Sequence, residues 1–166
     1  MSIFFPDLMV KDIYSLPLED LKKRGIRCLL FDVDNTIVPY NSQGLTEETI
    51  DWFRIPKEHG FLMSILSNNS DERVFPVAEK IGIPFIARAK KPLSDGAKRA
   101  MEMLEVTPEE TAMVGDQLIT DVLGGNCMGF YTIVVQPINK NEFWGTRINR
   151  KLEKIIYAFM KLRKRK

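Results

Sequence analysis

The chain has few of the residues that bind soft metals or form cross-links. Its 166 residues include two cysteines, Cys28 and Cys127, and one histidine, His59. The cysteines are far apart in the sequence and form no Cys-x-x-Cys pair, which argues against a zinc site and against a disulfide framework. We interpret both cysteines as small core residues in a reducing compartment.

Long apolar runs and targeting signals are also missing. No apolar segment approaches the ~18 residues that a membrane span needs, and residues 1–5 lack the basic start and the length of a signal peptide. Gly124-Gly125-Asn126 has neither the spacing of a dinucleotide fingerprint nor a P-loop lysine, so we expect it to end a helix. These absences predict a cytoplasmic protein.

The small net charge of +2 hides a strong asymmetry. Residues 147–166 contain nine Lys/Arg and one acid, a net charge of +8, whereas residues 1–146 carry −6. We predict a domain over residues 1–140 and a basic amphipathic helix and tail over residues 141–166, because Ile148, Leu152 and Ile155 recur at helical spacing. Three roles for this helix remain open, namely packing against the domain, binding to an anionic membrane surface, and binding to nucleic acid or the ribosome.

What the sequence does contain is an acidic motif directly after an apolar run. Cys28-Leu29-Leu30-Phe31 predicts a buried strand, and Asp32-Val33-Asp34-Asn35-Thr36 follows it. Two carboxylates this close repel each other unless a cation lies between them or one is protonated, and hard oxygen ligands suit Mg²⁺. The alternative is a turn rich in Asp and Asn without catalytic meaning.

Polar residues follow the later strands in the same way. Ser67-Asn68 follows the predicted strand 61–66, Lys90-Lys91-Pro92 follows strand 83–87, and Gly115-Asp116 with Asp121 follows strand 111–114. A fifth strand is predicted over residues 130–135. Strands and helices alternate with short connections, which predicts an α/β, doubly wound (Rossmann-like) fold with a mainly parallel five-stranded sheet. The carboxyl ends of parallel strands meet at one edge, so these polar residues should share one pocket.

Several local expectations accompany this fold. We expect the first twenty-five residues to pack beside strand 28–31, with a short helix over residues 18–24. Thr46 should begin a helix that Pro56 kinks or ends, and Pro92 should lie in the first turn of a helix over residues 93–104. His59, just before Gly60, is expected to be a helix-end residue.

These motifs resemble those of the haloacid dehalogenase superfamily of phosphatases. Asp32 to Thr36, Ser67, Lys91-Pro92 and Gly115-Asp116 through Asp121 are similar to its four motifs, in order. The Asp-x-Asp-Asn-Thr form resembles subfamily IIIA, and Pro6-Asp7 with the chain length resembles the YqeG group, over about residues 4–140. The resemblance implies the strand order 3-2-1-4-5.

The resemblance also implies a role for each residue. Asp32 would be the nucleophile that forms an aspartyl-phosphate, and Asp34 the general acid and base. Asp32, Asp116 and the backbone carbonyl of Asp34 would bind Mg²⁺. Ser67, Asn68 and Lys91 would bind the substrate phosphate, with Lys90 as an alternative to Lys91, and Thr36 and Asp121 would support the site.

Spacing and charge add an expectation about the substrate. Thirty residues separate Thr36 from Ser67 and twenty-three separate Ser67 from Lys91, which leaves no room for a large cap domain. An open pocket and a basic tail favour a large or membrane-bound phosphomonoester at the inner membrane face. The resemblance implies a lipid phosphate like phosphatidylglycerophosphate, because a phosphatidylglycerophosphate phosphatase is a distant relative of the YqeG group. The alternatives are a soluble small-molecule phosphatase and a ribosome-, nucleic-acid- or protein-binding factor. A response-regulator receiver domain is excluded because no acid follows the third predicted strand.

Overall fold

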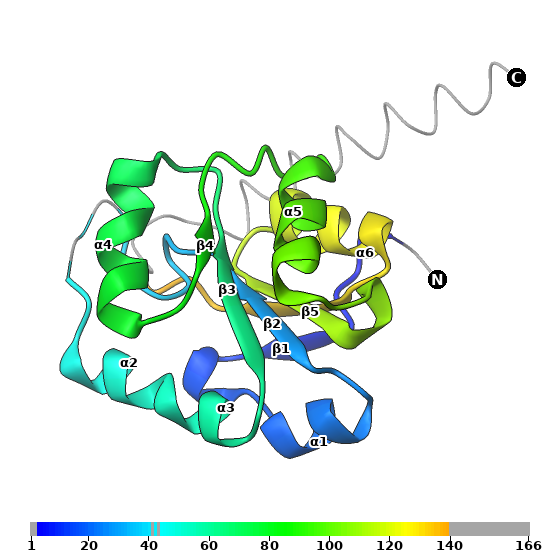
Figure 1. Ribbon diagram of the computed structural model, residues 1–166, viewed down its shortest axis with the longest axis horizontal. Helices are drawn as coiled ribbons and strands as arrows, with labels where there is room; N and C mark the ends of the chain where they lie inside the picture. The colour runs from blue at the N-terminus through cyan, green and yellow to red at the C-terminus, as the bar shows by residue number, and fades with distance from the viewer. Residues whose placement is uncertain (1–2, 41, 43, 140–166) are drawn as a thin grey trace, which may run out of the picture.

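The fold is a single parallel sheet covered by helices on both faces (Figure 1). The computed structural model of the protein describes residues 3–40, 42 and 44–139. Within these residues, six parallel strands lie in the order β1-β6-β5-β2-β3-β4. Their bounds are Leu8–Val10 (β1), Cys28–Phe31 (β2), Leu62–Leu66 (β3), Phe85–Ile86 (β4), Thr111–Gly115 (β5) and Tyr131–Val135 (β6). The predicted α/β Rossmann-like class is confirmed.

The prediction of five strands in the order 3-2-1-4-5 was wrong as a description of the whole sheet, because it omitted β1 at the edge beyond the fifth predicted strand. The five predicted segments correspond to β2 through β6, and β1 lies beyond β6 at the edge of the sheet. We expected the first twenty-five residues beside strand 28–31, but β1 pairs with β6 instead. Residues 13–21 do pack against side chains of strand 28–31, as Ile13 and Leu21 share a core with Leu29 and Phe31. Asp7 fixes the pairing, since its carboxylate accepts hydrogen bonds from the backbone N–H of Thr132 at 2.8 Å and from its hydroxyl at 3.2 Å.

Helices and short helical turns join the strands. The α-helices are Leu18–Lys23 (α1), Glu47–Trp52 (α2), Arg54–Glu58 (α3), Asp71–Ile81 (α4), Asp95–Leu104 (α5) and Gly124–Met128 (α6). Two 3₁₀ turns, Ile13–Ser15 (η1) and Pro108–Glu110 (η2), and one π-helical segment, Leu118–Leu123 (η3), complete the described connections.

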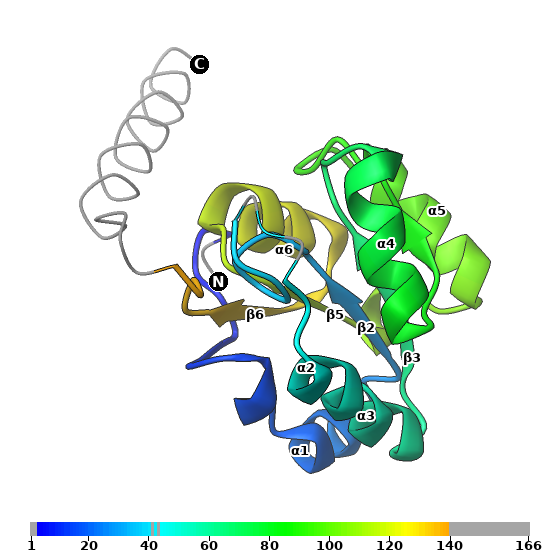
Figure 2. The same cartoon turned by 90° about the vertical axis from the view of Figure 1, so that its left-hand side faces the viewer.

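The alternation of side chains along β2 divides the interior into two cores. Leu29 and Phe31 face one side, where they pack with residues of α1, α2 and α4, including Trp52. Cys28 and Leu30 face the other side, where α5 packs. Successive side chains of a strand point to opposite faces, so an apolar run without alternation is what a strand covered on both sides requires. Figure 2 shows the sheet from the side, with α1 to α3 below it and α5 and α6 above it.

The helix bounds near Pro56 and Pro92 differ from those predicted. Thr46 caps α2 as expected, with its hydroxyl accepting from the Thr49 N–H. The helix ends at Trp52, however, and Pro56 lies inside the first turn of α3, where its missing N–H costs nothing. Similarly, α5 begins at Asp95 rather than in the turn that contains Pro92.

The expectation that Gly124-Gly125 ends a helix was wrong, because both glycines lie inside α6. Gly129, with φ of +81°, ends this helix instead. A Cβ added at Gly125 would lie 2.6 Å from the Thr132 side chain, and one at Gly124 would lie 3.1 Å from Pro92. The glycines therefore permit close packing of α6 against the sheet and against the loop after β4.

The C-terminal segment and the possibility of a membrane span are the remaining features predicted from the sequence. The basic amphipathic helix predicted over residues 141–166 lies outside the described residues. In the part of the chain that is described, none of the helices has both the length and the apolar character to cross a membrane.

Candidate active site

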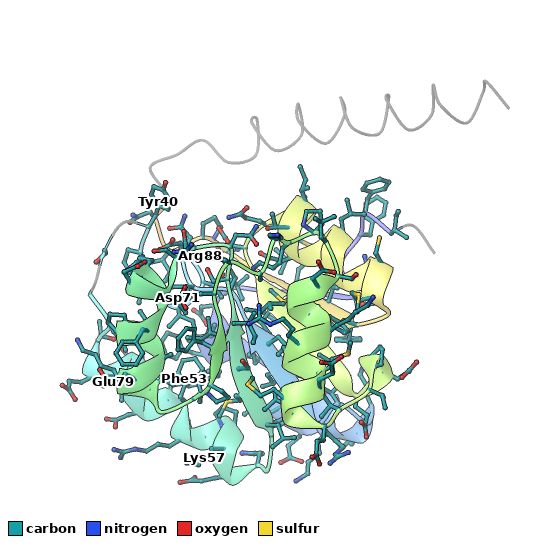
Figure 3. All side chains as sticks on the ribbon, turned by 45° about the horizontal axis from the view of Figure 1, so that its top comes forward. Tyr40, Phe53, Lys57, Asp71, Glu79 and Arg88 are labelled. Atoms are coloured by element: carbon teal, nitrogen blue, oxygen red, sulfur yellow. The ribbon has the colours of Figure 1, made fainter. Side chains whose placement is uncertain are left out.

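The predicted site residues lie at the carboxyl edge of the sheet, in loops that follow neighbouring strands. Figure 3 turns this edge toward the viewer, with Tyr40, Asp71 and Arg88 labelled along it and Lys57 of α3 at the opposite end. The loops after β2, β3, β4 and β5 supply the residues in question, which are Asp32, Asp34, Thr36, Ser67, Asn68, Lys91, Asp116 and Asp121. All of them are buried except Asn68.

Lys91 is the centre of the charged cluster. Its Nζ donates hydrogen bonds of 2.7 Å to Oδ1 of Asp32 and of 2.7 Å to Oδ1 of Asp121. The side chain is 5% exposed, so these ion pairs are shielded from solvent. Lys90, which the sequence left as an alternative, has φ of +58° and an exposed side chain. Of the two lysines, the fold brings Lys91 to the carboxylates.

Burial and mutual repulsion change the protonation of this cluster. Burial raises the pKa of Asp32 to about 6, with the charge of Asp121 adding to the effect and that of Lys91 opposing it. Burial, followed by the charges of Asp121 and Asp32, raises the pKa of Asp116 to about 8. Burial alone would lower the pKa of Lys91, but the charges of Asp121 and Asp32 outweigh it and raise that pKa. The lysine stays charged, whereas the carboxylates need a further cation to be ionised together.

The three acids of the cluster are arranged to hold such a cation. One carboxylate oxygen each from Asp32, Asp116 and Asp121 can be chosen so that all lie within 4.8 Å of one another. Both carboxylate oxygens of Asp116 are buried and have no hydrogen-bond partner among the described residues. Unpaired buried oxygens are costly, and hard oxygen donors are what Mg²⁺ binds. The residues present therefore fit a divalent metal.

Gly115 allows Asp121 to reach this cluster. A Cβ at Gly115 would lie 2.2 Å from Oδ2 of Asp121 and 2.4 Å from its Cγ, so only glycine fits here. The π-helical segment η3 then turns Asp121 back toward β5, where Oδ2 accepts a 3.0 Å hydrogen bond from the Gln117 N–H and Oδ1 a 3.2 Å bond from the Thr120 hydroxyl. Asp116 directly after β5 and Asp121 in η3 thus lie close enough for their carboxylates to belong to one cluster.

Asp34 lies in a second network, formed by two residues that sequence reasoning did not identify. Its Oδ2 accepts a 2.7 Å hydrogen bond from Nδ2 of Asn69, and its Oδ1 forms an ion pair with Arg73. Asn69 also donates to the Ser67 hydroxyl, at 3.3 Å from its backbone N–H and 3.2 Å from Nδ2. The available signal was positional, because Asn69 lies two residues after Ser67 and Arg73 falls in the first turn of the helix that follows.

The side chain of Asn68 binds the protein backbone, whereas the hydroxyl of Thr36 is unpaired within the described part of the chain. The Asn68 side chain accepts a 2.6 Å hydrogen bond from the Lys91 N–H and donates a 2.9 Å bond to the Lys91 carbonyl. It thereby joins the loops after β3 and β4 and holds the backbone of Lys91. The Thr36 hydroxyl is buried and has no partner in the described ranges. Phosphate binding by Ser67, Asn68 and Lys91 stays a prediction.

Solved structures share this fold. A protein from Listeria monocytogenes serotype 4b superposes with a TM-score of 0.58 at 21% identity, over 71% of this chain and 84% of that one. The 3-deoxy-D-manno-octulosonate 8-phosphate phosphatase of Moraxella catarrhalis superposes with a TM-score of 0.54 at 21% identity, over 75% of this chain and 77% of that one. The latter structure contains a magnesium ion, a phosphate ion and a KDO molecule.

Sequence relatives extend the likeness beyond the fold. The Bacillus subtilis (strain 168) protein named "Probable phosphatase YqeG" is 41% identical over 160 residues, which cover 96% of this chain and 93% of that one. The phosphatidylglycerophosphate phosphatase 1 of Arabidopsis thaliana is 29% identical over 147 residues. That alignment covers 82% of this chain and 42% of the plant protein, so the chain spans less than half of the plant relative.

Fold, motifs and relatives together define the class. This chain is a phosphatase of the haloacid dehalogenase superfamily, that is, a phosphoric monoester hydrolase. The class was predicted from four motifs, each at the end of a different strand. Within the superfamily, the chain belongs to the family described as mitochondrial PGP phosphatase, whose family model matches residues 1–139.

Proposed function

We propose that the chain is a Mg²⁺-dependent phosphomonoester hydrolase that acts through an aspartyl-phosphate on Asp32. The observation that carries this proposal is the contact between Lys91 Nζ and Asp32 Oδ1 at 2.7 Å inside a buried group of acids. The ammonium group orients the carboxylate and offsets its charge, so that a second anion, the substrate phosphate, can approach. The lysine and the Ser67 hydroxyl then lie beside the phosphoryl oxygens, where charge spreads in the transition state.

Asp32, Asp116 and the backbone carbonyl of Asp34 would hold the metal, and Asp121 would support it. The unpaired oxygens of Asp116 and the acids' mutual distances support this assignment. When bound, Mg²⁺ would neutralise the carboxylates and draw electrons from the phosphoryl group. Its presence in the Moraxella catarrhalis structure is a property of that protein and makes magnesium the first ion to test here.

The two aspartates divide the reaction. An oxygen of Asp32 attacks phosphorus, the ester bond to the leaving oxygen breaks, and Asp34 gives a proton to that oxygen. Asp34 then takes a proton from water, which attacks phosphorus, and the bond from Asp32 to phosphorus breaks to release phosphate. Asn69 and Arg73 hold Asp34 in place for both steps.

The favoured substrate is a lipid phosphate at an anionic membrane surface, such as phosphatidylglycerophosphate. The Arabidopsis thaliana relative carries that lipid in its name, as does a relative from Chlamydomonas reinhardtii that is 26% identical over 95% of this chain and 62% of its own length. Large apolar side chains are exposed after three strands at the carboxyl edge, Tyr40 (59%), Leu93 (62%) and Ile138 (44%). Arg88 and Lys90, which lie with Leu93 in the loop after β4, suit anionic headgroups.

The access route to the site supports a large substrate as well. Among the described residues, the short helices α2 and α3 are the helices between β2 and β3, and α4 is the helix between β3 and β4. Without a large cap, the carboxyl edge itself can rest on the surface that carries the ester. In this proposal the protein acts at the inner face of a membrane without spanning it.

Purified protein should be assayed with Mg²⁺ against phosphatidylglycerophosphate in mixed micelles and against a panel of soluble phosphomonoesters, with Asp32→Asn as the inactive control. We expect turnover of the lipid well above the panel, lost in Asp32→Asn and on addition of EDTA. Preferential turnover of a soluble ester would refute the membrane substrate but leave the phosphatase mechanism. Turnover that survives Asp32→Asn would refute the nucleophile. A protein that binds Mg²⁺ but hydrolyses nothing would favour a binding factor instead.

A further inference from the structure

Arg73 is a cation beside the active site. The proposed reaction uses it only to hold Asp34, which leaves part of its hydrogen-bonding capacity unused among the described residues. It lies in the first turn of α4, and its guanidinium forms an ion pair with Oδ1 of Asp34. The Arg73 side chain is 19% exposed and that of Asp34 is 10% exposed, so the pair lies at the mouth of the site rather than in its floor. Part of the guanidinium therefore remains accessible to a molecule that enters the pocket.

The hydrogen bonds of Arg73 are incomplete. A guanidinium has five N–H donors, and the Nε donor of Arg73 is buried without a partner among the residues that the structure describes. Asp34 does not need all of this capacity, because its other oxygen is already bound by Asn69 at 2.7 Å. A buried, charged donor without a partner is destabilising, whereas a planar guanidinium with free donors is suited to a carboxylate or a phosphate.

The position of Arg73 relative to the reacting groups limits what it can bind. Asp32 and Lys91 face the phosphoryl group, and Asp34 faces the oxygen that leaves with the alcohol. Among the described residues Arg73 pairs with Asp34 whereas Lys91 pairs with Asp32, so Arg73 lies beside the residue that the proposed mechanism assigns to the leaving alcohol. An anion bound there belongs to the alcohol part of the substrate and not to the phosphate that is removed.

We infer that Arg73 forms a second anion-binding subsite, and that the preferred substrates are phosphomonoesters whose alcohol carries a further negative charge close to the ester oxygen. This inference rests on the proposed hydrolase function and adds the class of leaving group. Phosphatidylglycerophosphate is one ester of this class, because its glycerol carries a phosphodiester. A phosphorylated alcohol without such a charge reaches the same catalytic groups but leaves the Arg73 donors unpaired.

The test compares two esters of glycerol. Dihexanoyl phosphatidylglycerophosphate, used below its micelle concentration, has a leaving alcohol with a phosphodiester, whereas glycerol 3-phosphate has an uncharged leaving alcohol. For Arg73→Gln we expect kcat/KM for the charged ester to fall by ~10- to 100-fold, as the loss of a charge-assisted hydrogen bond implies. The value for glycerol 3-phosphate should fall by a smaller factor, because Arg73 also holds Asp34 for the reaction of any ester, so the ratio of the two kcat/KM values measures the subsite. Arg73→Lys, which keeps the charge but not the planar fork, should give an intermediate selectivity. Lys80→Gln, an exposed change in the last turn of the same helix, is the matched control.

A binding measurement separates this inference from the proposed function. Dihexanoyl phosphatidylglycerol contains the diester but no phosphomonoester, and it should raise the melting temperature of the wild type and of Lys80→Gln but not that of Arg73→Gln. An equal loss of kcat/KM for both esters, or the same thermal shift in Arg73→Gln and wild type, would overturn the subsite. Hydrolysis of neither ester by the wild type would overturn the proposed function, while the thermal shift would still decide whether Arg73 binds the diester.

Discussion

Asp116 should destabilise the metal-free protein, and replacing it with asparagine should make that cost measurable. The carboxyl group is buried with two unpaired oxygens, and its pKa is raised from the usual 3.8 to about 8, by burial first and then by the charges of Asp121 and Asp32. Folding therefore favours the protonated acid. Between about pH 4 and pH 8 the folded chain holds a proton that the unfolded chain has lost, so the free energy of unfolding falls as pH rises across this range.

The size of this effect follows from the displacement of the pKa. A change from 3.8 to about 8 corresponds to a cost on the order of 5 kcal/mol at pH values above 8. The charge is shared with Asp32 and Asp121, whose own ionisation changes in response, so we expect Asp116→Asn to stabilise the metal-free protein by ~2–4 kcal/mol at about pH 8.5. Near pH 3 the two proteins should differ little, because the acid is then mostly protonated in both the folded and the unfolded state.

Urea unfolding in EDTA at several pH values, followed by tryptophan fluorescence, measures this difference. Glu79→Gln, an exposed change in α4, is the control for loss of one acid and should keep the wild-type pH dependence. Added Mg²⁺ should reverse the order of stabilities. At ~1,000 times its Kd it adds about 4.1 kcal/mol to the wild type, more at high pH than at low pH, and much less to Asp116→Asn. Parallel pH profiles for wild type and Asp116→Asn, or equal stabilisation of both by Mg²⁺, would refute the reasoning.

Three further changes test the construction of the site and the fold. Gly115→Ala should reduce both stability, by ~1–3 kcal/mol, and activity, because the new methyl group occupies the position of the Asp121 carboxylate. In a double-mutant cycle by urea unfolding, Gly115→Ala should cost much less stability in an Asp121→Ala background. If the stability losses of the two substitutions simply add, the new methyl group does not collide with the Asp121 carboxylate. Asn68→Ala should lower kcat and unfolding free energy by loosening the backbone of Lys91, whereas a change in KM alone would indicate direct substrate contact. Gly125→Ala should lower the melting temperature through its collision with a β6 side chain while leaving KM unchanged, and an unchanged melting temperature would show that α6 can shift.

Much of the arrangement could be predicted because chain connectivity determines it. Each apolar run that reads as a strand ends in polar residues, and a parallel sheet necessarily collects those ends at one edge. Asp32, Lys91, Asp116 and Asp121 therefore share an edge whatever the details of the helices. The same reasoning failed for β1, since three residues at the rim of a sheet give too short a pattern to distinguish a strand from a loop.

Features that depend on contacts between distant side chains could not be predicted. Gly124 and Gly125 were interpreted from local propensity, but their reason is the nearness of Pro92 and Thr132, which only the packed structure brings close. Arg73 belongs to the same group. Its charge is unremarkable in a helix, and its partner lies 39 positions earlier in the sequence. Predictions from local propensity fail at positions where close packing between distant segments determines which residue fits.

The edge pairing of β1 with β6 has a consequence for how the chain matures. Asp7 and Thr132 are 125 positions apart, and among the described strands β1 pairs only with β6. During synthesis at ~5–20 residues per second, the first strand must wait for roughly ten seconds before its partner leaves the ribosome. Until then β1, and the edge of β5 that β6 later covers, are unpaired and can bind other chains. Nascent chains stalled before residue 131 should therefore be more prone to chaperone binding than those stalled well beyond residue 135.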